Sequence, residues 1–510
     1  MELLYIDLFC GAGGTSTGVE TARRNGERCA KVIACVNHDA NAIASHAANH
    51  PEALHFTEDI RTLELSPLVA HTAAMRRAYP DAFVVLWASL ECTNFSKAKG
   101  GQPRDADSRT LAEHLFRYVE AVDPDYIQIE NVEEFMSWGD LDASGKPISK
   151  DAGRMYRQWV GNVCGYGYRF DSRILNSADY GAYTSRRRFF GIFAKEGLPI
   201  VFPEPTHSRD GASGLFGGLK RWRPVREVLD FSDEGESIFG RRKPLVEATL
   251  ERIYAGLIKF VAGGRDAFLV KWNSMSRTGR YHAPGIDEPC PTVATQNRLG
   301  IARVNFLSKY YGGSPQGKNS SVEEPAGAVT TRDHHSFITA YYGNGHNHGI
   351  DSPAPTLTTK DRLAFVDMQY GNGTPAAVDR PAPTVTTNPK HQLVTCRRHG
   401  TSIPRCGTAG NADSPAMVKI REFMALYGIS DIRMRMLRIT ELKRIMGFPA
   451  DYVLVGTQAD QKKFIGNAVE VNMARVLCEA LCARLAETGA KPSRKAAKYM
   501  TYRKHQGYGE

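Results

Sequence analysis

Short apolar runs separated by helical patterns fill the first 200 residues of the chain. The runs are continuously apolar, as strands buried on both faces of a sheet are. We expect strands at Leu3–Phe9, Lys31–Val36, Leu54–Phe56, Phe83–Ala88, Tyr126–Ile129, Arg169–Leu175 and Arg188–Phe193. Helical patterns lie between them, at Thr15–Arg24, Ala40–Ala48 and Ser108–Val122. This alternation predicts an α/β fold with a doubly wound, mostly parallel sheet.

The middle of the chain carries a four-fold repeat with a different pattern. Its copies read EPCPTVAT, EPAGAVTT, SPAPTLTT and RPAPTVTT. They begin at Glu288, Glu324, Ser352 and Arg380, so the successive spacings are 36, 28 and 28 residues. In each copy we expect a short strand, a proline turn and a threonine-rich strand. Repeats of this length usually pack on their neighbours and share one core.

Two interpretations of the repeat remain open. One is a stack of β-hairpins without chemistry, and the other is a platform that binds nucleic acid. Basic residues follow the threonine-rich strand in three copies, which favours the platform. These residues are Arg332, His334, Lys360, Arg362 and Lys390.

The change of pattern divides the chain into four parts. We expect a first catalytic part at 1–202 and an inserted β-rich domain at 203–416, with the repeats at about 268–395. A second catalytic part follows at 417–486, and a basic, mobile tail at 487–510.

The composition indicates a net positive charge and a reducing compartment. The formal net charge is +10, which is compatible with a polyanionic partner without proving one. No apolar run approaches the roughly 20 residues of a membrane helix, and the first residues do not read as a secretory signal. Ten cysteines without close framework spacing suggest reduced thiols in a cytoplasm. Cys396, His399 and Cys406 lack a fourth ligand, so we expect no metal site.

A glycine-rich turn follows the first predicted strand, in the sequence DLFCGAGG at 7–14. Its glycines let the backbone turn tightly and approach a ligand. It is not the dinucleotide fingerprint, because position 16 holds neither glycine nor alanine. Polar groups follow the next two strands: Asn37 with Asp39, and Asp59 with Ile60. The turn holds no Lys or Arg, which favours a nucleoside without phosphates. S-adenosylmethionine fits.

Cys92 lies just past the carboxyl end of the fourth predicted strand, where ligands bind in such sheets. A lone cysteine is usually a small buried hydrophobe. Here Thr93, Asn94 and Ser96 make the surrounding loop polar, which argues for a nucleophile instead.

A carboxylate and a pair of arginines also stand at strand ends. Glu130, in the sequence IENV, either caps a helix or faces the same rim as Cys92. The segment DYGAYTSRRR leads into the last predicted strand. Alternation along that strand would put Arg186 and Arg188 on the same side, although a basic surface turn is an alternative.

Together these motifs resemble the cytosine-C5 DNA methyltransferases. The resemblance rests on DLFCGAGG, the cysteine loop, ENV and the Arg-x-Arg after DYG, with GNAV at 466–469 after MGFP. All five occur in the family's order and spacing, across about residues 1–200 and 417–485. The resemblance implies a Rossmann-like methyltransferase fold with S-adenosylmethionine as cofactor, and it places the middle region in the slot of the target recognition domain.

The family's roles carry over to matching positions. Cys92 would attack carbon 6 of a flipped cytosine, Glu130 would hold or protonate N3, and Arg188 with Arg186 would bind the O2 side. No metal is needed for this reaction. The residues implied to bind the cofactor are Asp7, Phe9, Gly11, Gly13, Asn37, His38, Asp59, Ile60, Asn467 and Val469. Those expected to bind DNA are Ser96, Lys97, Lys99, Arg332, Lys360 and Arg362.

The cysteine loop departs from the family, which usually has Pro-Cys-Gln where this chain has Glu91-Cys92-Thr93. A carboxylate about 5 Å from the thiolate would raise the thiol pKa by about 2 at an effective dielectric of about 20. That is the wrong direction for a nucleophile. Glu91 therefore points away, pairs with Lys97 or Lys99, or serves another role. Asn37 also replaces the usual glutamate, and Tyr183-Thr184 replaces Pro-Gln.

Several functions are therefore weighed. The leading hypothesis is methylation of cytosine in duplex DNA. The alternatives are a modified methyl donor, RNA as the substrate, or an inactive homologue that binds DNA. The long repeat insertion favours duplex DNA, and the intact set of Cys92, Glu130 and Arg188 argues against inactivity. A nicotinamide-dependent dehydrogenase is disfavoured by the missing glycine pattern. We expect a monomer in a bacterial or phage-infected cytoplasm, and a restriction endonuclease partner is left open.

Overall fold

The computed structural model describes most of the chain outside the repeat region. The described residues are 1–90, 112–139, 153–211, 218–261, 267–271, 283–295, 299–303, 413–427, 429 and 431–492. Between 307 and 393 it describes five short strands: β17 (Leu307–Ser308), β18 (Asn319–Ser320), β19 (Phe365–Met368), β20 (Ala376–Ala377) and β21 (His391–Leu393). Most of the repeat therefore lies outside the described residues.

A seven-stranded sheet organises the first 200 residues, in the order β5-β4-β1-β6-β7-β10-β8. All pairings are parallel except those that β10 makes with β7 and β8. The strands are β1 (Leu3–Leu8), β4 (Ala30–Val36), β5 (Leu54–Phe56), β6 (Phe83–Ser89), β7 (Tyr126–Asn131), β8 (Tyr168–Asn176) and β10 (Arg187–Lys195). The predicted doubly wound, mostly parallel sheet is confirmed.

Helices cover both faces of this sheet, which explains why its strands are apolar throughout. Along β1, Leu4, Ile6 and Leu8 pack on one face, with α3 (Ser66–Ala78), α5 (Leu115–Val122) and α6 (Arg154–Cys164). Leu3 and Tyr5 pack on the other face, with α1 (Gly14–Thr21) and α11 (Val471–Thr488). The side-chain period of two along each strand thus supplies two separate cores.

One predicted helix is wrong at its end. Thr15–Arg24 was expected to be helical, but α1 stops at Thr21 and a hairpin follows, with β2 (Arg23–Arg24) paired to β3 (Glu27–Arg28). The cause is local, because Asn25 and Gly26 both adopt positive φ, as a two-residue hairpin turn requires. The described part of Ser108–Val122 becomes helical at Leu115.

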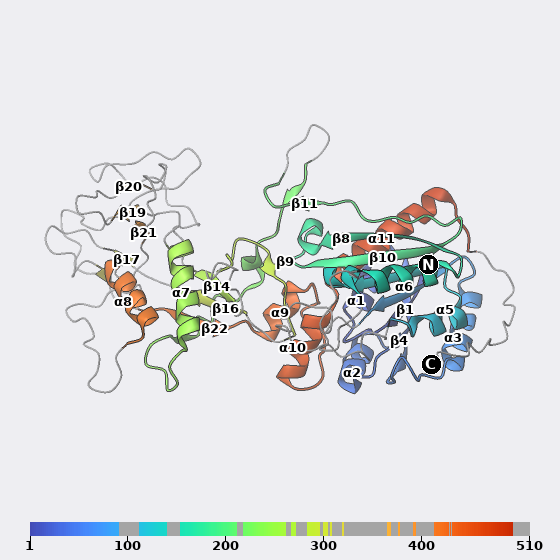
Figure 1. Cartoon of the computed structure of the whole chain (residues 1–510), viewed down its shortest axis with the longest axis horizontal. Coiled ribbons are helices and arrows are strands. Elements are labelled where there is room, and N and C mark those ends of the chain that lie inside the picture. The colour runs from blue at the N-terminus through green and yellow to red at the C-terminus, as the bar shows by residue number, and fades with distance from the viewer. Residues whose placement is uncertain are drawn as a thin grey trace.

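A second sheet lies toward the opposite end of the molecule from β1 and β4 (Figure 1). It is antiparallel, in the order β13-β22-β16-β14. Its strands are β13 (Glu236–Ser237), β14 (Ala267–Lys271), β16 (Leu299–Arg303) and β22 (Arg433–Met436), and α7 (Glu247–Phe260) and α8 (Pro415–Tyr427) pack on it. The expected boundary at 416/417 therefore does not match the packing, because α8 and β22 belong with the inserted sheet. The chain returns toward the large sheet only after Leu437.

The last helices fold back beside the first strand, as the sequence suggested. After α9 (Ile439–Ile445) and α10 (Gln458–Asn467), α11 packs along α1. Two glycines of α1 allow this close approach. A Cβ on Gly14 would lie 2.5 Å from the carbonyl oxygen of Val469, and one on Gly18 would overlap the backbone of Val471.

The remaining elements are short. They are α2 (Ala40–Asn49), β9 (Thr184–Ser185), β11 (His207–Ser208), β12 (Lys220–Arg221), β15 (Cys290–Pro291) and the 3-10 helices η2 (Glu133–Ser137), η4 (Ser177–Tyr180) and η5 (Val225–Val228). Within the described part of the chain, every helix is too short or too polar to span a bilayer.

Candidate active site

The carboxyl ends of five parallel strands meet at one edge of the large sheet. The chain leaves β1 toward β4 and β5, and then returns to the other side of β1 as β6. Such a reversal opens a crevice at the strand ends, where open α/β sheets bind ligands. The glycine loop after β1 and the end of β6 flank this point.

The glycine loop holds an uncommon backbone. Phe9, Gly11 and Gly13 have φ values of 58°, 52° and 99°. Positive φ is strained for a bulky residue such as Phe9, and strain of this kind concentrates at ligand sites. No described atom lies within 4 Å of a Cβ built on Gly11, so this part of the loop faces open space. At Gly13 the Tyr452 hydroxyl fills that position instead.

The end of β4 presents small polar groups. The Asn37 side-chain oxygen accepts a hydrogen bond from the Asp39 backbone N–H at 2.9 Å, and His38 is exposed. Asp39 caps α2 and pairs with Lys463 at 3.0 Å. Asp39 is therefore a helix cap, which leaves Asn37 and His38 as the groups beside the loop.

The end of β5 presents a carboxylate that is already paired. Arg61 donates two side-chain hydrogen bonds to Asp59 Oδ2, and one side-chain and one backbone hydrogen bond to Oδ1, at 2.7–3.1 Å. These bonds lower the pKa of Asp59 to about 2, so the carboxylate stays ionised. Ile60 is buried, and its carbonyl accepts from the Tyr118 hydroxyl.

The C-terminal candidates arrive with α10. Val469 is buried, and its backbone lies against Gly14 at the start of α1. Asn467, two residues earlier, is exposed at the end of α10. The segment GNAV therefore lies against the glycine loop region through Val469.

Among the predicted catalytic residues, the clearest contact joins Glu130 to Arg188. Glu130 is almost fully buried near the end of β7, and its register neighbour on β6 is Ser89. Arg188 is the second residue of β10, which runs antiparallel to β7, so its side chain reaches the same edge. The Arg188 Nε lies 3.4 Å from Glu130 Oε1. Burial raises the pKa of the Glu130 carboxyl, against the opposing pull of Arg186 and Arg188.

The cysteine loop leaves this same edge. The carbonyl of Leu90 accepts a hydrogen bond from the Asn131 side chain at 3.4 Å, which ties the start of the loop to the strand of Glu130. Cys92 itself lies outside the described residues, as do the predicted DNA contacts Ser96, Lys97, Lys99, Arg332, Lys360 and Arg362.

Arg186 acts on the same Glu130 carboxyl as Arg188, but it is more deeply buried and also contacts distant parts of the chain. It is 3% exposed, and its Nη1 donates to the backbone carbonyls of Val293 and Gly466 at 3.4 and 3.3 Å. Nearby, β9 pairs with β15, which lies within the first repeat copy. Arg186 thus holds together the catalytic strand, the inserted region and α10, a contact set that alternation along one strand does not predict.

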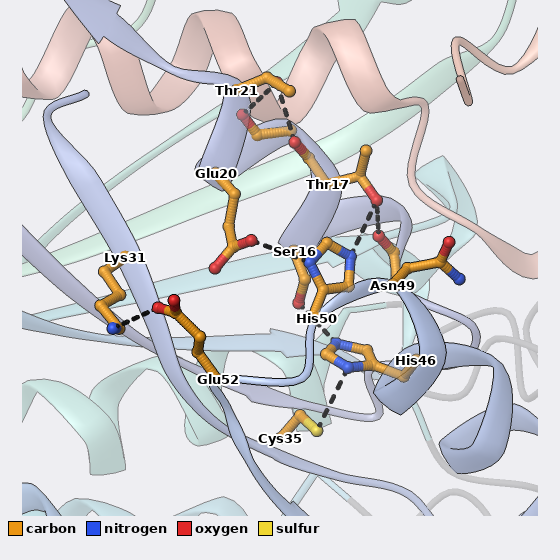
Figure 2. Close-up of polar contacts among 12 residues, drawn as sticks. Ser16, Thr17, Glu20, Thr21, Lys31, Cys35, His46, Asn49, His50 and Glu52 are labelled. Carbon is orange, nitrogen blue, oxygen red and sulfur yellow. Dashed lines mark hydrogen bonds and ion pairs between the residues drawn. The ribbon is translucent and has the colours of Figure 1, made fainter. Parts of the chain in front are cut away.

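A buried polar network beneath the glycine loop escaped the sequence analysis (Figure 2). Ser16 Oγ donates to Asp7 Oδ2 at 2.8 Å and lies 2.9 Å from His46 Nε2. His50 contacts Thr17 Oγ1 at 3.1 Å and Glu20 Oε2 at 3.0 Å. The two histidines are four residues apart, with His46 in α2 and His50 as its C-terminal cap, and this spacing was the available signal. Asp7 thus reaches Ser16 rather than open space.

Comparison with known proteins was made against family models, curated proteins and solved structures. A family model described as C-5 cytosine-specific DNA methylase matches residues 3–213 and 358–483. The chain is 31% identical over 211 residues to the type II methyltransferase M.AgeI of Thalassovita gelatinovora, covering 41% of this chain and 44% of that protein. It is 30% identical over 208 residues to M.XorII of Xanthomonas oryzae pv. oryzae, covering 39% and 43%.

The chain spans about half the length of the curated relatives it matches. Among solved structures, the Dnmt2 methyltransferase of S. pombe aligns with a TM-score of 0.45 at 14% identity, covering 96% of this chain and all of that one. A likeness of that degree carries no argument on substrate.

Proposed function

Since this chain belongs to the C-5 cytosine-specific DNA methylase family, we propose that it methylates carbon 5 of cytosine in duplex DNA, with S-adenosylmethionine as donor. One observation carries the proposal: Arg188 Nε lies 3.4 Å from the buried carboxylate of Glu130, at the edge from which the Cys92 loop departs. An acid, a cation and a nucleophile are the groups that the reaction requires.

Carbon 5 of cytosine is a poor nucleophile, so the ring must first be activated. The Cys92 thiolate adds to carbon 6, and the electrons of the C5–C6 double bond become available at carbon 5. Two peptide bonds separate Cys92 from Leu90, so the chain keeps their Cα atoms within about 7.6 Å. The Leu90 carbonyl accepts a hydrogen bond from the side chain of Asn131, the residue after Glu130. The short stretch of chain from Leu90 to Cys92 therefore supports an attack by Cys92 beside Glu130.

Glu130 acts as the acid of the site. Burial raises the pKa of its carboxyl, so the protonated form persists at higher pH than in water. That proton is donated to ring N3, where it neutralises the negative charge that thiolate addition delivers to the ring.

Arg188 holds the other side of the base and fixes the carboxyl. Its guanidinium is a planar cation with several N–H donors, and it binds the O2 side of the ring. After methyl transfer, a base removes the proton from carbon 5. The electron pair of that C–H bond re-forms the C5–C6 double bond, the thiolate of Cys92 leaves, and ring N3 returns its proton to Glu130.

The groups at the strand ends are suited to binding the nucleoside part of the donor, which carries no phosphate. Gly11 faces open space, and Asn37 and Asp59 offer oxygen acceptors for hydroxyl or amine groups at neighbouring strand ends. When bound, the donor supplies a methyl group on a sulfonium. The residues proposed to hold it are Asp7, Phe9, Gly11, Gly13, Asn37, His38, Asp59, Ile60, Asn467 and Val469. Asp7 contributes indirectly, because its carboxylate accepts a hydrogen bond from Ser16 beneath the glycine loop.

A cytosine in duplex DNA is stacked, so the enzyme must flip it out, at a cost of a few kcal/mol. We assign phosphate and base contacts to Ser96, Lys97 and Lys99 beside the nucleophile. Arg332, Lys360 and Arg362 are assigned to the repeat platform of the target recognition domain. Phosphate contacts position the duplex, and contacts to base edges specify the sequence.

The direct test is bisulfite sequencing of DNA from cells that express the chain. The proposal predicts conversion-resistant cytosines in one fixed sequence context, and none in cells expressing Cys92→Ser at the same level. Fully converted DNA from cells that contain folded, donor-binding protein would refute it. Modified cytosine in RNA alone would move the substrate to RNA.

A further inference from the structure

A cluster of sulfur and nitrogen ligand atoms lies beneath the glycine loop, outside the site described above. The Sγ atoms of Cys10 and Cys35 and a ring nitrogen of His46 all lie within 4.8 Å of one another, and all three residues are buried. They come from the loop after β1, from β4 and from α2. A fourth donor comes from β5, because His55 Nε2 lies 2.9 Å from His46 Nδ1.

The hydrogen bonds around His46 fix which of its nitrogens is a ligand. Burial raises the pKa of Asp7 to about 8; in its ionised form Asp7 accepts the only hydroxyl proton of Ser16, so toward His46 Ser16 can then only accept. His46 Nε2 therefore carries the proton and donates it to Ser16 Oγ, 2.9 Å away. This leaves Nδ1 unprotonated, with its lone pair toward Cys35 Sγ at 3.6 Å and His55.

The distance between Cys35 Sγ and His46 Nδ1 matches a tetrahedral zinc site, and His55 is the ligand that must move, because it is not among the residues whose ligand atoms all lie within 4.8 Å of one another. With Zn–S of about 2.3 Å and Zn–N of about 2.0–2.1 Å, sulfur and nitrogen ligands lie about 3.5 Å apart. Cys35 Sγ and His46 Nδ1 are 3.6 Å apart. Two nitrogens would lie about 3.3 Å apart, so His55 would shift outward by about 0.4 Å. It can do so because it is only half-buried, on the edge strand of the sheet.

We propose that Cys10, Cys35, His46 and His55 bind a Zn²⁺ ion. Two thiolates and two imidazoles are a set that zinc prefers, and four protein ligands leave no open position, so the ion is structural. Ser16 and Asp7 form its outer shell, since a metal-binding histidine usually donates its second N–H to such a partner. The half-buried His55 gives the ion an entry path.

The ion would tie the glycine loop to three other elements. Cys10 immediately precedes Gly11, so its side chain anchors the loop from below, while the backbone at Gly11 faces open space. The proposal does not rest on methyl transfer, because the ligands and their outer shell are defined by the fold alone.

A second cluster provides an internal control. Cys29, Cys478 and Cys482 are buried, and their ligand atoms also lie within 4.8 Å of one another. This second cluster offers only three thiols. It joins the start of β4 to α11, away from the glycine loop. A variant such as Cys478→Ala therefore separates the two locations.

The test uses the full chain, free of any affinity tag and kept reduced. Metal is measured by mass spectrometry after dialysis, and again after removal of metal and refilling with Zn²⁺ or Co²⁺. We expect one ion per chain, and the cobalt form should show thiolate charge-transfer bands with the strong d–d absorption of a tetrahedral site. Cys35→Ala and His55→Gln should lose the ion, whereas Cys478→Ala should keep it.

An outer-shell variant adds a graded readout. Ser16→Ala should weaken zinc affinity by about 10- to 100-fold while leaving the four ligands in place. The proposal is overturned if the refilled wild-type chain holds no stoichiometric metal. It is also overturned if cobalt shows no thiolate bands, or if Cys478→Ala rather than Cys35→Ala abolishes binding.

Discussion

At the scale of single residues, burial decides what Glu130 can do. Glu130→Gln keeps the shape and a hydrogen-bond donor but supplies no proton. We expect kcat to fall by about 10²- to 10⁴-fold, the usual contribution of a general acid. Binding of DNA and donor should persist. The measurement is transfer of labelled methyl groups to DNA under saturating conditions.

Glu133→Gln is the matched control for this prediction. Glu133 lies three residues away but is 40% exposed and pairs with the surface Arg187. Its kcat should stay close to that of the wild type. Since burial raises the pKa of Glu130, the wild-type rate should also fall as alkaline pH removes the proton, and Glu130→Gln should lack that decline. An unchanged kcat in Glu130→Gln would remove this residue from the chemistry.

Glu470 gives a prediction on stability. It is fully buried and caps α11 by accepting from the backbone N–H groups of Asn472 and Met473. Burial raises its pKa from 4.5 to about 7. Between these values the folded protein keeps a proton that the unfolded chain has lost, so stability falls as pH rises across this window.

Glu470→Gln keeps the capping oxygen and removes the titration. Relative to wild type it should be nearly neutral at pH 5 and more stable at pH 8, by at most about 3 kcal/mol. A carboxylate at a helix N-terminus is worth only about 0.3–1 kcal/mol in the opposite direction. Urea unfolding of both proteins at the two pH values measures the difference. A difference that does not change with pH would contradict the assignment.

Much of the candidate site could be anticipated residue by residue. Glu130, Arg188 and the glycine loop stand at strand ends, and the sheet brings those ends to one edge. The contacts of Arg186 could not be predicted, because its partners Val293 and Gly466 are 107 and 280 residues away in the sequence. Position in one strand says nothing about such distant carbonyls.

At the scale of elements, the contact between α1 and α11 depends on glycine. Ala is favoured over Gly in a helix by about 1 kcal/mol. At Gly18, however, a Cβ would lie 2.7 Å from Ala474 Cβ and 2.9 Å from the backbone N of Arg475. Overpacking of this kind costs about 1–3 kcal/mol, so Gly18→Ala should destabilise the protein.

Gly161 on α6 is the control, because a Cβ there would meet nothing within 4 Å. Gly161→Ala should stabilise by about 0.5–1 kcal/mol. Thermal unfolding of the two variants should therefore shift Tm in opposite directions. Equal shifts would mean that α11 does not pack on Gly18 as described.

The strands of the large sheet were predictable because buried strands leave a strong apolar signal. Leu54–Phe56 was placed without error, and the others to within about two residues. The error after Thr21 came from favouring helical periodicity over the Asn25–Gly26 turn. Turn chemistry of two residues was enough to end the helix.

At the scale of the whole molecule, the catalytic fold is discontinuous. Val469 reaches Gly14 across a large insertion, and Arg186 binds both the insertion and α10. The sequence predicted this return from the resemblance of GNAV to its family. It misplaced the edge of the insertion, because α8 and β22 read as ordinary helical chain. Only the pairing of β22 with β16 and the packing of α8 into the same core assign them to the inserted sheet.

The central claim is that Cys92 adds covalently to cytosine beside Glu130. The most direct measurement uses duplex DNA that carries 5-fluorocytosine at the methylated position, with S-adenosylmethionine present. Fluorine cannot leave carbon 5 as a proton does, so the wild-type chain should remain attached to the DNA in denaturing gels. Cys92→Ser should bind the duplex without attachment. Wild-type protein that methylates unmodified DNA but never forms the attached species, or Cys92→Ser that still forms it, would contradict the account.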